Sequence, residues 1–91
     1  MYDLEIKPTA DKIFSKLAKK NPQHLMIIDK KIQEIRENPT GYKFLKTPLN
    51  GFNRVHIDKH FVLIFQIDHE HKIIDIYYFG HHDSVYNWRP K

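Results

Sequence analysis

The hydrophobic and polar positions of this chain follow two different periods, and each period predicts one kind of element. Residues 2–6 alternate polar and apolar side chains, which predicts a half-buried strand at the start. Farther along, β-branched and aromatic runs of strand length occupy residues 55–57, 61–67 and 73–77, separated by polar turn residues. We expect these three runs to form an antiparallel meander whose last strand ends at Gly80.

Two helices are predicted between the first strand and the meander, because apolar residues recur there at three-and-four spacing. We expect Thr9 to cap a first helix that runs to about Lys20. Asn21 should cap the second helix, which has Pro22 at its first position and continues to Asn38. The apolar stripes are Ile13, Phe14 and Leu17 in the first helix and Leu25, Ile28, Ile32 and Ile35 in the second.

The expected fold is a single α+β domain over residues 1–91, because a chain of this length builds one core. The two helices should form an antiparallel hairpin on one face of a single, mostly antiparallel sheet, which offers the only apolar surface available to them. The segment over residues 42–49 has no clear period and is predicted to be a loop ordered by its apolar members. For the tail around Tyr86 and Trp88, the pattern leaves both a helical turn and a short strand open.

Charge and composition point to an anionic partner. The chain has 15 lysines and arginines against 11 acidic residues, a net charge of +4, and its basic residues gather in residues 7–20 and 41–60. Such stretches attract RNA, DNA or an acidic protein segment; the alternative is that the helix lysines only solvate an exposed face. No cysteine is present, and no apolar run approaches the length of a membrane span. We therefore expect a cytoplasmic protein without disulfides and without a membrane segment.

The seven histidines raise the question of a metal site. Zinc needs about four converging ligands, and neither a cysteine nor an HExxH helix pattern completes such a set here. We therefore expect no metal and no cofactor. His69 and His71 are predicted to lie in a solvated turn, and His24 is predicted to lie on the surface of the second helix.

Three other histidines are brought toward one another by the predicted meander: His56 near the end of one strand, His60 beyond a tight turn, and His82 after the last strand. Imidazoles transfer protons near neutral pH, so two or three of them suit in-line cleavage of RNA, which needs a base for the ribose 2′-hydroxyl and an acid for the leaving oxygen. Scattered surface histidines are the alternative interpretation. The cations that could stabilise the phosphate are Lys43, Lys46 and Arg54.

Three sequence segments follow the predicted strand and helix hairpin, and their order along the chain is informative. They are Leu45-Lys46-x-Pro48-Leu49-x-Gly51-x-x-Arg54-x-His56-Ile57, then Phe61-Val62-Leu63-Ile64-Phe65-x-Ile67, then Gly80-His81-His82-x-x-Val85-Tyr86. This ordered set resembles the RelE/ParE superfamily of type II toxin–antitoxin toxins, and its histidines are similar to those of the YafQ-like branch. The resemblance implies a RelE-like fold and a ribosome-dependent mRNA endonuclease. It also implies a small acidic, RelB-like antitoxin that binds the toxin in a hetero-oligomer and holds it inactive.

The resemblance also implies roles for individual residues. His82 would act on the scissile phosphate or its leaving group, and Tyr86 would stack on a base. His56 would transfer a proton or bind a phosphate. His60 and Phe61 stand where the YafQ-like branch has an aspartate and a tryptophan, so His60 would take part in catalysis and Phe61 would contact the RNA. Arg54 matches a basic position of RelE proper and would hold a phosphate.

Two positions depart from the family pattern. Val62 stands where RelE proper has an arginine, and Thr47 stands where YafQ-like toxins have a histidine. Either change could reduce or redistribute activity. The motif Gly80-His81-x-x-x-Val85-Tyr86 also resembles ParE-like members, which bind DNA gyrase and cleave nothing, so a non-cleaving toxin and an inactive relative stay open as alternatives.

Overall fold

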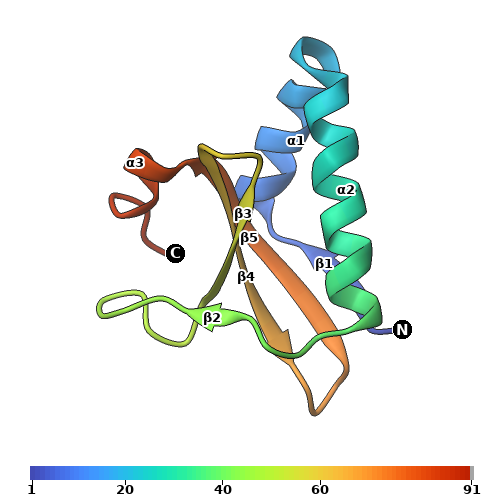
Figure 1. The fold of residues 1–91 in the computed structure, drawn as a ribbon, viewed down its shortest axis with the longest axis vertical. Helices are drawn as coiled ribbons and strands as arrows, with labels where there is room; N and C mark the ends of the chain where they lie inside the picture. Colours follow the sequence, from blue (N-terminus) through green and yellow to red (C-terminus); the bar gives the residue numbers. More distant parts are fainter. Residues whose placement is uncertain (91) are drawn as a thin grey trace.

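A five-stranded sheet organises the computed structural model, which describes residues 1–90 (Figure 1). Its strands lie in the order β1 (Asp3–Ile6), β5 (Ile73–His81), β4 (Phe61–Asp68), β3 (Asn53–Ile57) and β2 (Lys43–Phe44). β1 pairs with β5 in parallel, and the remaining neighbours pair in antiparallel fashion. The predicted α+β fold with a mostly antiparallel sheet is confirmed, with one parallel pair at its edge.

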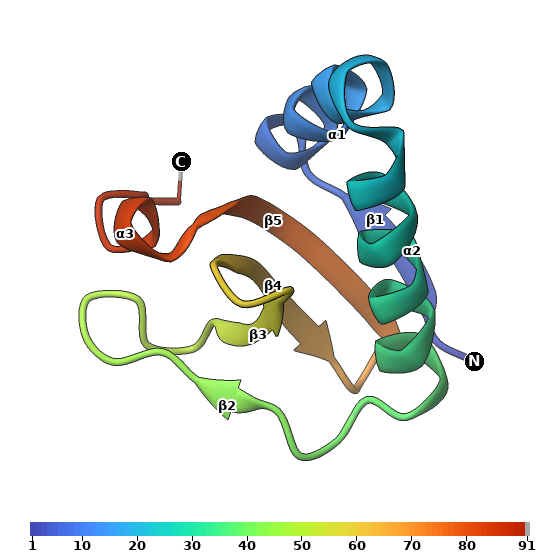
Figure 2. The ribbon, with the colours of Figure 1, turned by 45° about the horizontal axis from the view of Figure 1, so that its top comes forward.

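Helices α1 (Pro8–Lys20) and α2 (Pro22–Glu37) cover one face of this sheet, as Figure 2 shows. The predicted stripes supply the contact: Ile28, Ile32 and Ile35 of α2 are buried, and Ile13 and Leu17 of α1 pack partly buried against the same core. We call this the helix-side core; its strand members include Ile57, Leu63, Phe65, Ile74, Ile76 and Phe79. No helix within residues 1–90 is long and apolar enough to cross a membrane.

The two helix starts differ from each other in their capping. Asn21 caps α2 as predicted, because its Oδ1 accepts a hydrogen bond from the backbone N–H of His24 at 3.2 Å. The predicted cap at Thr9 is wrong: α1 begins at Pro8, after Lys7, and no side chain within residues 1–90 caps it. Proline already has the φ of a first helical residue and has no N–H to satisfy, so this helix starts without a capping side chain.

His24 is buried, which corrects the prediction that it lies on the surface. Only 8% of the residue is exposed, and its ring meets the rings of Phe61 and Phe79 edge-on, at centroid distances of 4.7 and 5.2 Å. The imidazole therefore forms part of the helix-side core, at the end of the sheet where α2 begins.

A second, smaller core lies on the face of the sheet that α1 and α2 leave uncovered. We call it the second core; its buried members are Leu45, Leu49, Phe52, Val62, Ile64 and Val85. A register shift between Ile64 and Phe65 lets both Tyr77 and Tyr78 pack against this core. The apolar members of the segment over residues 42–49 order it, as expected, but Lys43 and Phe44 pair with β3 and form the short strand β2, which the prediction of a loop missed.

The chain turns from strand to helix beside Gly80. β5 continues through Gly80 to His81, one residue farther than predicted, and α3 (His82–Val85) follows at once, which decides for the helical alternative in the tail. A Cβ on Gly80 would lie 2.7 Å from the hydroxyl oxygen of Tyr78. A larger residue at this position would therefore require the Tyr78 ring to move.

Candidate active site at the end of strand β5

Two segments that are distant in sequence meet where β5 passes into α3. His60 ends the turn between β3 and β4, and His81 and His82 lie at the junction of β5 and α3. Phe61 pairs with His81 in the sheet, and the backbone N–H of His82 donates to the carbonyl of His60 at 2.8 Å. Backbone pairing therefore holds these three histidines side by side.

The three imidazole rings form a compact group. Their centroids are 4.4 Å apart for His81 and His82, 6.1 Å for His60 and His81, and 6.3 Å for His60 and His82. The side chains of His81 and His82 are 44% and 47% exposed. Solvent, and hence a substrate, reaches the rings without any rearrangement of the core.

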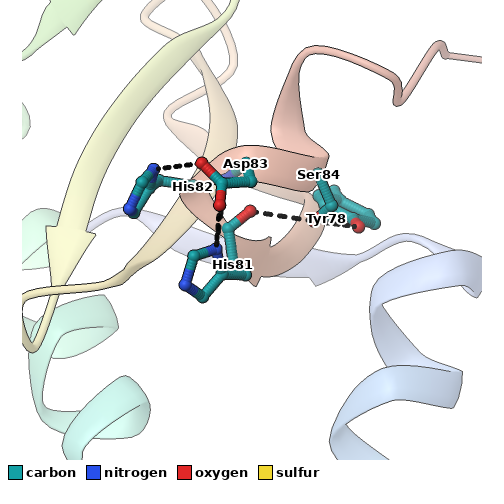
Figure 3. A network of polar contacts seen from close by, with 5 residues as sticks. All are labelled: Tyr78, His81, His82, Asp83 and Ser84. Carbon is teal, nitrogen blue, oxygen red and sulfur yellow. Dashed lines mark hydrogen bonds and ion pairs between the residues drawn. The ribbon is translucent and has the colours of Figure 1, made fainter.

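Asp83 contacts both rings of the β5–α3 junction (Figure 3). Its Oδ1 lies 3.0 Å from Nδ1 of His82, and its Oδ2 lies 3.5 Å from Nδ1 of His81. The backbone N–H of Asp83 also donates to Nδ1 of His81 at 3.2 Å, which caps the helical turn. When His82 donates its Nδ1–H to the carboxylate, its Nε2 is left to face a reactant.

Contacts to the body of the protein fix the helical turn that carries His82. The hydroxyl of Ser84 donates to the carbonyl of His81 at 2.8 Å and lies 3.2 Å from the hydroxyl of Tyr78. Val85 is buried in the second core. The turn is thus anchored on both sides, so His82 is presented from a rigid base.

His56 stands apart from this group. It pairs with Val62, which in turn pairs with Gly80, so the His56 backbone lies two strand spacings, about 10 Å, from Gly80. Among residues 1–90 its side-chain partner is Arg54, whose Nη1 lies 3.4 Å from Nδ1 of the imidazole. The structure therefore brings His60 and His82 together, as the meander predicted, but not His56.

A basic strip runs beside the second core. Arg54 is paired with Ile64 on one side and Lys43 on the other, and directly opposite residues share a face of the sheet. Lys46 is exposed in the segment that follows β2. In the described part of the chain, none of these three cations forms an ion pair. The strip of Lys43, Lys46, Arg54 and His56 is therefore open to an anionic partner.

The two aromatic residues of the predicted site have different surroundings. Tyr86 is 67% exposed, directly after α3, where a base could stack on it. Phe61 instead stacks on Phe79, with ring centroids 5.4 Å apart, and meets His24 edge-on. This packing places the partly buried Phe61 against the helix-side core, and its contact with RNA stays a prediction.

The predicted site lacked two residues that the structure places in the group, His81 and Asp83. Neighbouring residues of a strand point to opposite faces, so strand periodicity separates His81 from His82. The change from strand to helix between these two residues brings their rings together instead. The adjacency of two histidines and an acid directly after a strand was the available signal.

Comparison with known proteins identifies relatives over nearly the whole chain. Residues 4–86 match the family described as the ParE toxin of the type II toxin–antitoxin system parDE. A protein of Methanocaldococcus jannaschii, provisionally named toxin RelE4, is 50% identical over 86 residues, which cover 94% of this chain and 92% of that protein.

Solved structures of toxins have the same fold. The YoeB–YefM complex of Staphylococcus aureus matches with a TM-score of 0.75 and 20% identity, over 90% of this chain and 98% of that chain. A metal-bound toxin from Helicobacter pylori matches with a TM-score of 0.75 and 26% identity, over 93% of this chain and 99% of that chain.

Proposed function

Because this chain belongs to the RelE/ParE superfamily of type II toxin–antitoxin toxins, we propose that it is an endoribonuclease that cleaves mRNA on the ribosome without a metal. The observation that carries this proposal is the close approach of His60 and His82, on a sheet whose basic strip has no ion pair within residues 1–90. Two imidazoles at this separation offer a base and an acid to the two sides of one phosphate.

In the proposed reaction, His60 acts as the base and His82 as the acid. His60 takes the proton of the ribose 2′-hydroxyl, whose oxygen attacks the adjacent phosphorus. The bond from phosphorus to the 5′-oxygen breaks, a 2′,3′-cyclic phosphate forms, and His82 protonates the leaving oxygen. Asp83 orients the His82 ring through the contact with Nδ1.

The basic strip supplies the positive charge that this reaction needs. Arg54, Lys43 and Lys46 would bind phosphates on either side of the cut, and His56 would add a further phosphate contact beside Arg54. Val62 is buried in the second core, directly opposite His56, so it cannot replace the arginine of RelE proper. Arg54 on the neighbouring strand is the cation best placed to take over that charge.

The expected regulator is a small acidic, RelB-like antitoxin that binds this chain in a hetero-oligomer. The YoeB–YefM pair of Staphylococcus aureus, whose toxin is a structural relative, was also solved as a heterotetrameric toxin–antitoxin complex. The net charge of +4 and the open basic strip of this chain suit an acidic partner, which would compete with mRNA and the ribosome for the same face.

A second candidate function follows from the match to the ParE family. In that case the same surface would bind DNA gyrase and nothing would be cleaved. The exposed Tyr86 and the basic strip would then contact protein and not RNA.

The test is in vitro translation with the purified protein, followed by mapping of transcript ends. We expect the wild-type protein to cut the transcript and His82→Ala to cut it about 10²–10⁴-fold more slowly, as is usual when a general acid or base is removed. His69→Ala is the matched control, because the eight-residue strand β4, about 23 Å long, separates His69 from His60.

A transcript with a 2′-deoxy nucleotide at the cut position tests the proposed attack by the 2′-hydroxyl. The attacking oxygen is missing there, so the wild-type protein should leave that position intact. Normal cleavage of the deoxy position would contradict the proposed chemistry. Growth arrest without transcript cleavage, together with a loss of gyrase activity, would favour the ParE-like function.

A further inference from the structure

We propose that the imidazoles of His60, His81 and His82 form a binding site for a divalent transition metal, with Zn²⁺ as the best-suited ion. The ligand nitrogens of these three side chains all lie within 4.8 Å of one another. The sequence alone does not predict this set, because no pair of histidines in it has further ligands nearby that would complete a metal site.

The geometry is close to that of a bound ion. Tetrahedral zinc with bonds of about 2.0–2.1 Å to nitrogen requires ligand nitrogens about 3.3 Å apart. Binding would shorten the present separations by rotation of the exposed rings, on backbones that are already held by the pairing of Phe61 with His81 and by the 2.8 Å hydrogen bond from His82 to His60. The fold therefore pre-arranges the ligands, and binding would not require a change in the sheet.

Asp83 supplies the outer support that histidine ligands of metals commonly have. A carboxylate that accepts Nδ1–H leaves the Nε2 lone pair free for the ion and orients the ring. Asp83 already holds this position toward His82, at 3.0 Å. His81 Nδ1 now accepts a hydrogen bond from the backbone N–H of Asp83. On metal binding it would instead donate its Nδ1–H to Oδ2 of Asp83, which lies 3.5 Å away.

The ligand type selects the class of ion. Three imidazoles suit zinc, copper(II) and nickel(II), whereas magnesium and calcium prefer oxygen ligands. Three protein ligands leave at least one position open, which is typical of an exchangeable site and not of a closed structural one.

One consequence rests on the proposed nuclease function: zinc should inhibit cleavage. The ion would occupy the nitrogen lone pairs of His60 and His82, through which the proposed reaction takes and delivers protons. Catalysis without a metal and inhibition by a metal are thus two outcomes of the same arrangement of side chains.

The binding test is calorimetric titration of tag-free, chelator-treated protein with zinc chloride, without RNA. We expect one ion per chain. Asp83→Asn should weaken binding about 10–100-fold, as removal of a carboxylate behind a histidine ligand usually does, and His81→Ala should weaken it further. The double variant His69→Ala/His71→Ala, which removes two exposed histidines at the far turn, should bind zinc as the wild type does.

Two results would overturn the site. One is the absence of zinc binding at millimolar zinc. The other is binding that survives His81→Ala but is lost in the His69→Ala/His71→Ala protein, because the ion would then belong to the far turn. Shifts of the backbone amide signals of residues 60, 81 and 82 on zinc addition would locate the ion independently of any variant that fails to fold.

The inhibition test adds zinc and then a chelator to the translation assay. Cleavage that falls with zinc and returns with the chelator supports the consequence, and cleavage that needs zinc contradicts it. A wild-type protein that never cleaves would overturn the nuclease function alone, since calorimetry reports the metal site without any cleavage.

Discussion

At the scale of single residues, Asp75 is a carboxyl group outside the proposed site whose pKa is changed by burial. Its side chain is mostly buried in β5, Lys7 Nζ lies 3.9 Å from its Oδ1, and that oxygen has no hydrogen-bond partner among the described residues. Burial raises the pKa of Asp75, the neighbouring Glu5 raises it further, and Lys7 opposes both effects. The ionised carboxylate is thus less favourable in the folded chain than in the unfolded one.

This pKa direction predicts the effect of Asp75→Asn on stability. Because the folded-state pKa is raised, the stability that Asp75 contributes is present below its ordinary value of 3.8 and is lost as pH rises through the raised value. The uncharged asparagine avoids that loss, so the variant should be more stable than the wild type near neutral pH, and the difference should shrink on acidification. Urea unfolding at several pH values measures this.

The control for this prediction is Asp29→Asn, which changes an exposed carboxylate of α2. Its effect on the free energy of unfolding should be small. A destabilised Asp75→Asn protein at neutral pH would mean that the contact with Lys7 outweighs the cost of burial.

At the scale of elements, helix α2 is held by a stripe of isoleucines and not by its helix-forming tendency. Ile28 is fully buried, with 0% exposed, between the sheet and α1. A short amphipathic helix is marginal in water by itself, so burial of this stripe provides most of its stability. The same packing places His24, at the start of α2, against Phe61 beside the histidine group.

Ile28→Ala should therefore lower the free energy of unfolding by about 2–5 kcal/mol, because it removes buried methyl and methylene groups and leaves a cavity. Met26→Ala, two residues away and 70% exposed, is the matched control and should change stability by less than about 0.5 kcal/mol. Equal effects of the two changes, measured by denaturant unfolding, would contradict the arrangement of α2.

At the scale of the whole molecule, the two faces of the sheet are covered differently. One face is covered by α1 and α2 (Figure 2), the other carries the second core and the basic strip, and the histidine group lies at the end of the sheet where β5 passes into α3. With a net charge of +4 and its strip cations unpaired within residues 1–90, the molecule should attract RNA chiefly by electrostatics.

Association with RNA or ribosomes should accordingly weaken as salt is added, since each phosphate contact releases counterions. Arg54→Ala should reduce the slope of log affinity against log salt by about 0.7–1 unit, the effect of one lost contact. Lys12→Ala removes the same charge from α1, on the closed side, and should leave the slope nearly unchanged. Salt-independent association would instead point to a protein target of the ParE-like kind.

Much of this fold follows from local sequence signals, without any tertiary contact. Both long helices and four of the five strands could be predicted from signals that act within a few residues. These signals are the asparagine and proline at residues 21–22, the apolar stripes and the β-branched runs. Strand β2 could not, because two residues without a period become a strand only when β3 lies beside them.

The composition of the candidate site depends on the register between paired strands, and the register is known only once the chain is folded. From the sequence alone, imidazoles and cations are expected along the meander, with His60 and His82 near each other. Strand pairing and packing were needed to show that His81 and Asp83 join them, that His56 lies apart, and that Phe61 packs against the buried His24. The physical reason is that side chains remote in sequence meet through strand pairing and packing, where a shift of one residue reverses the face on which each side chain lies.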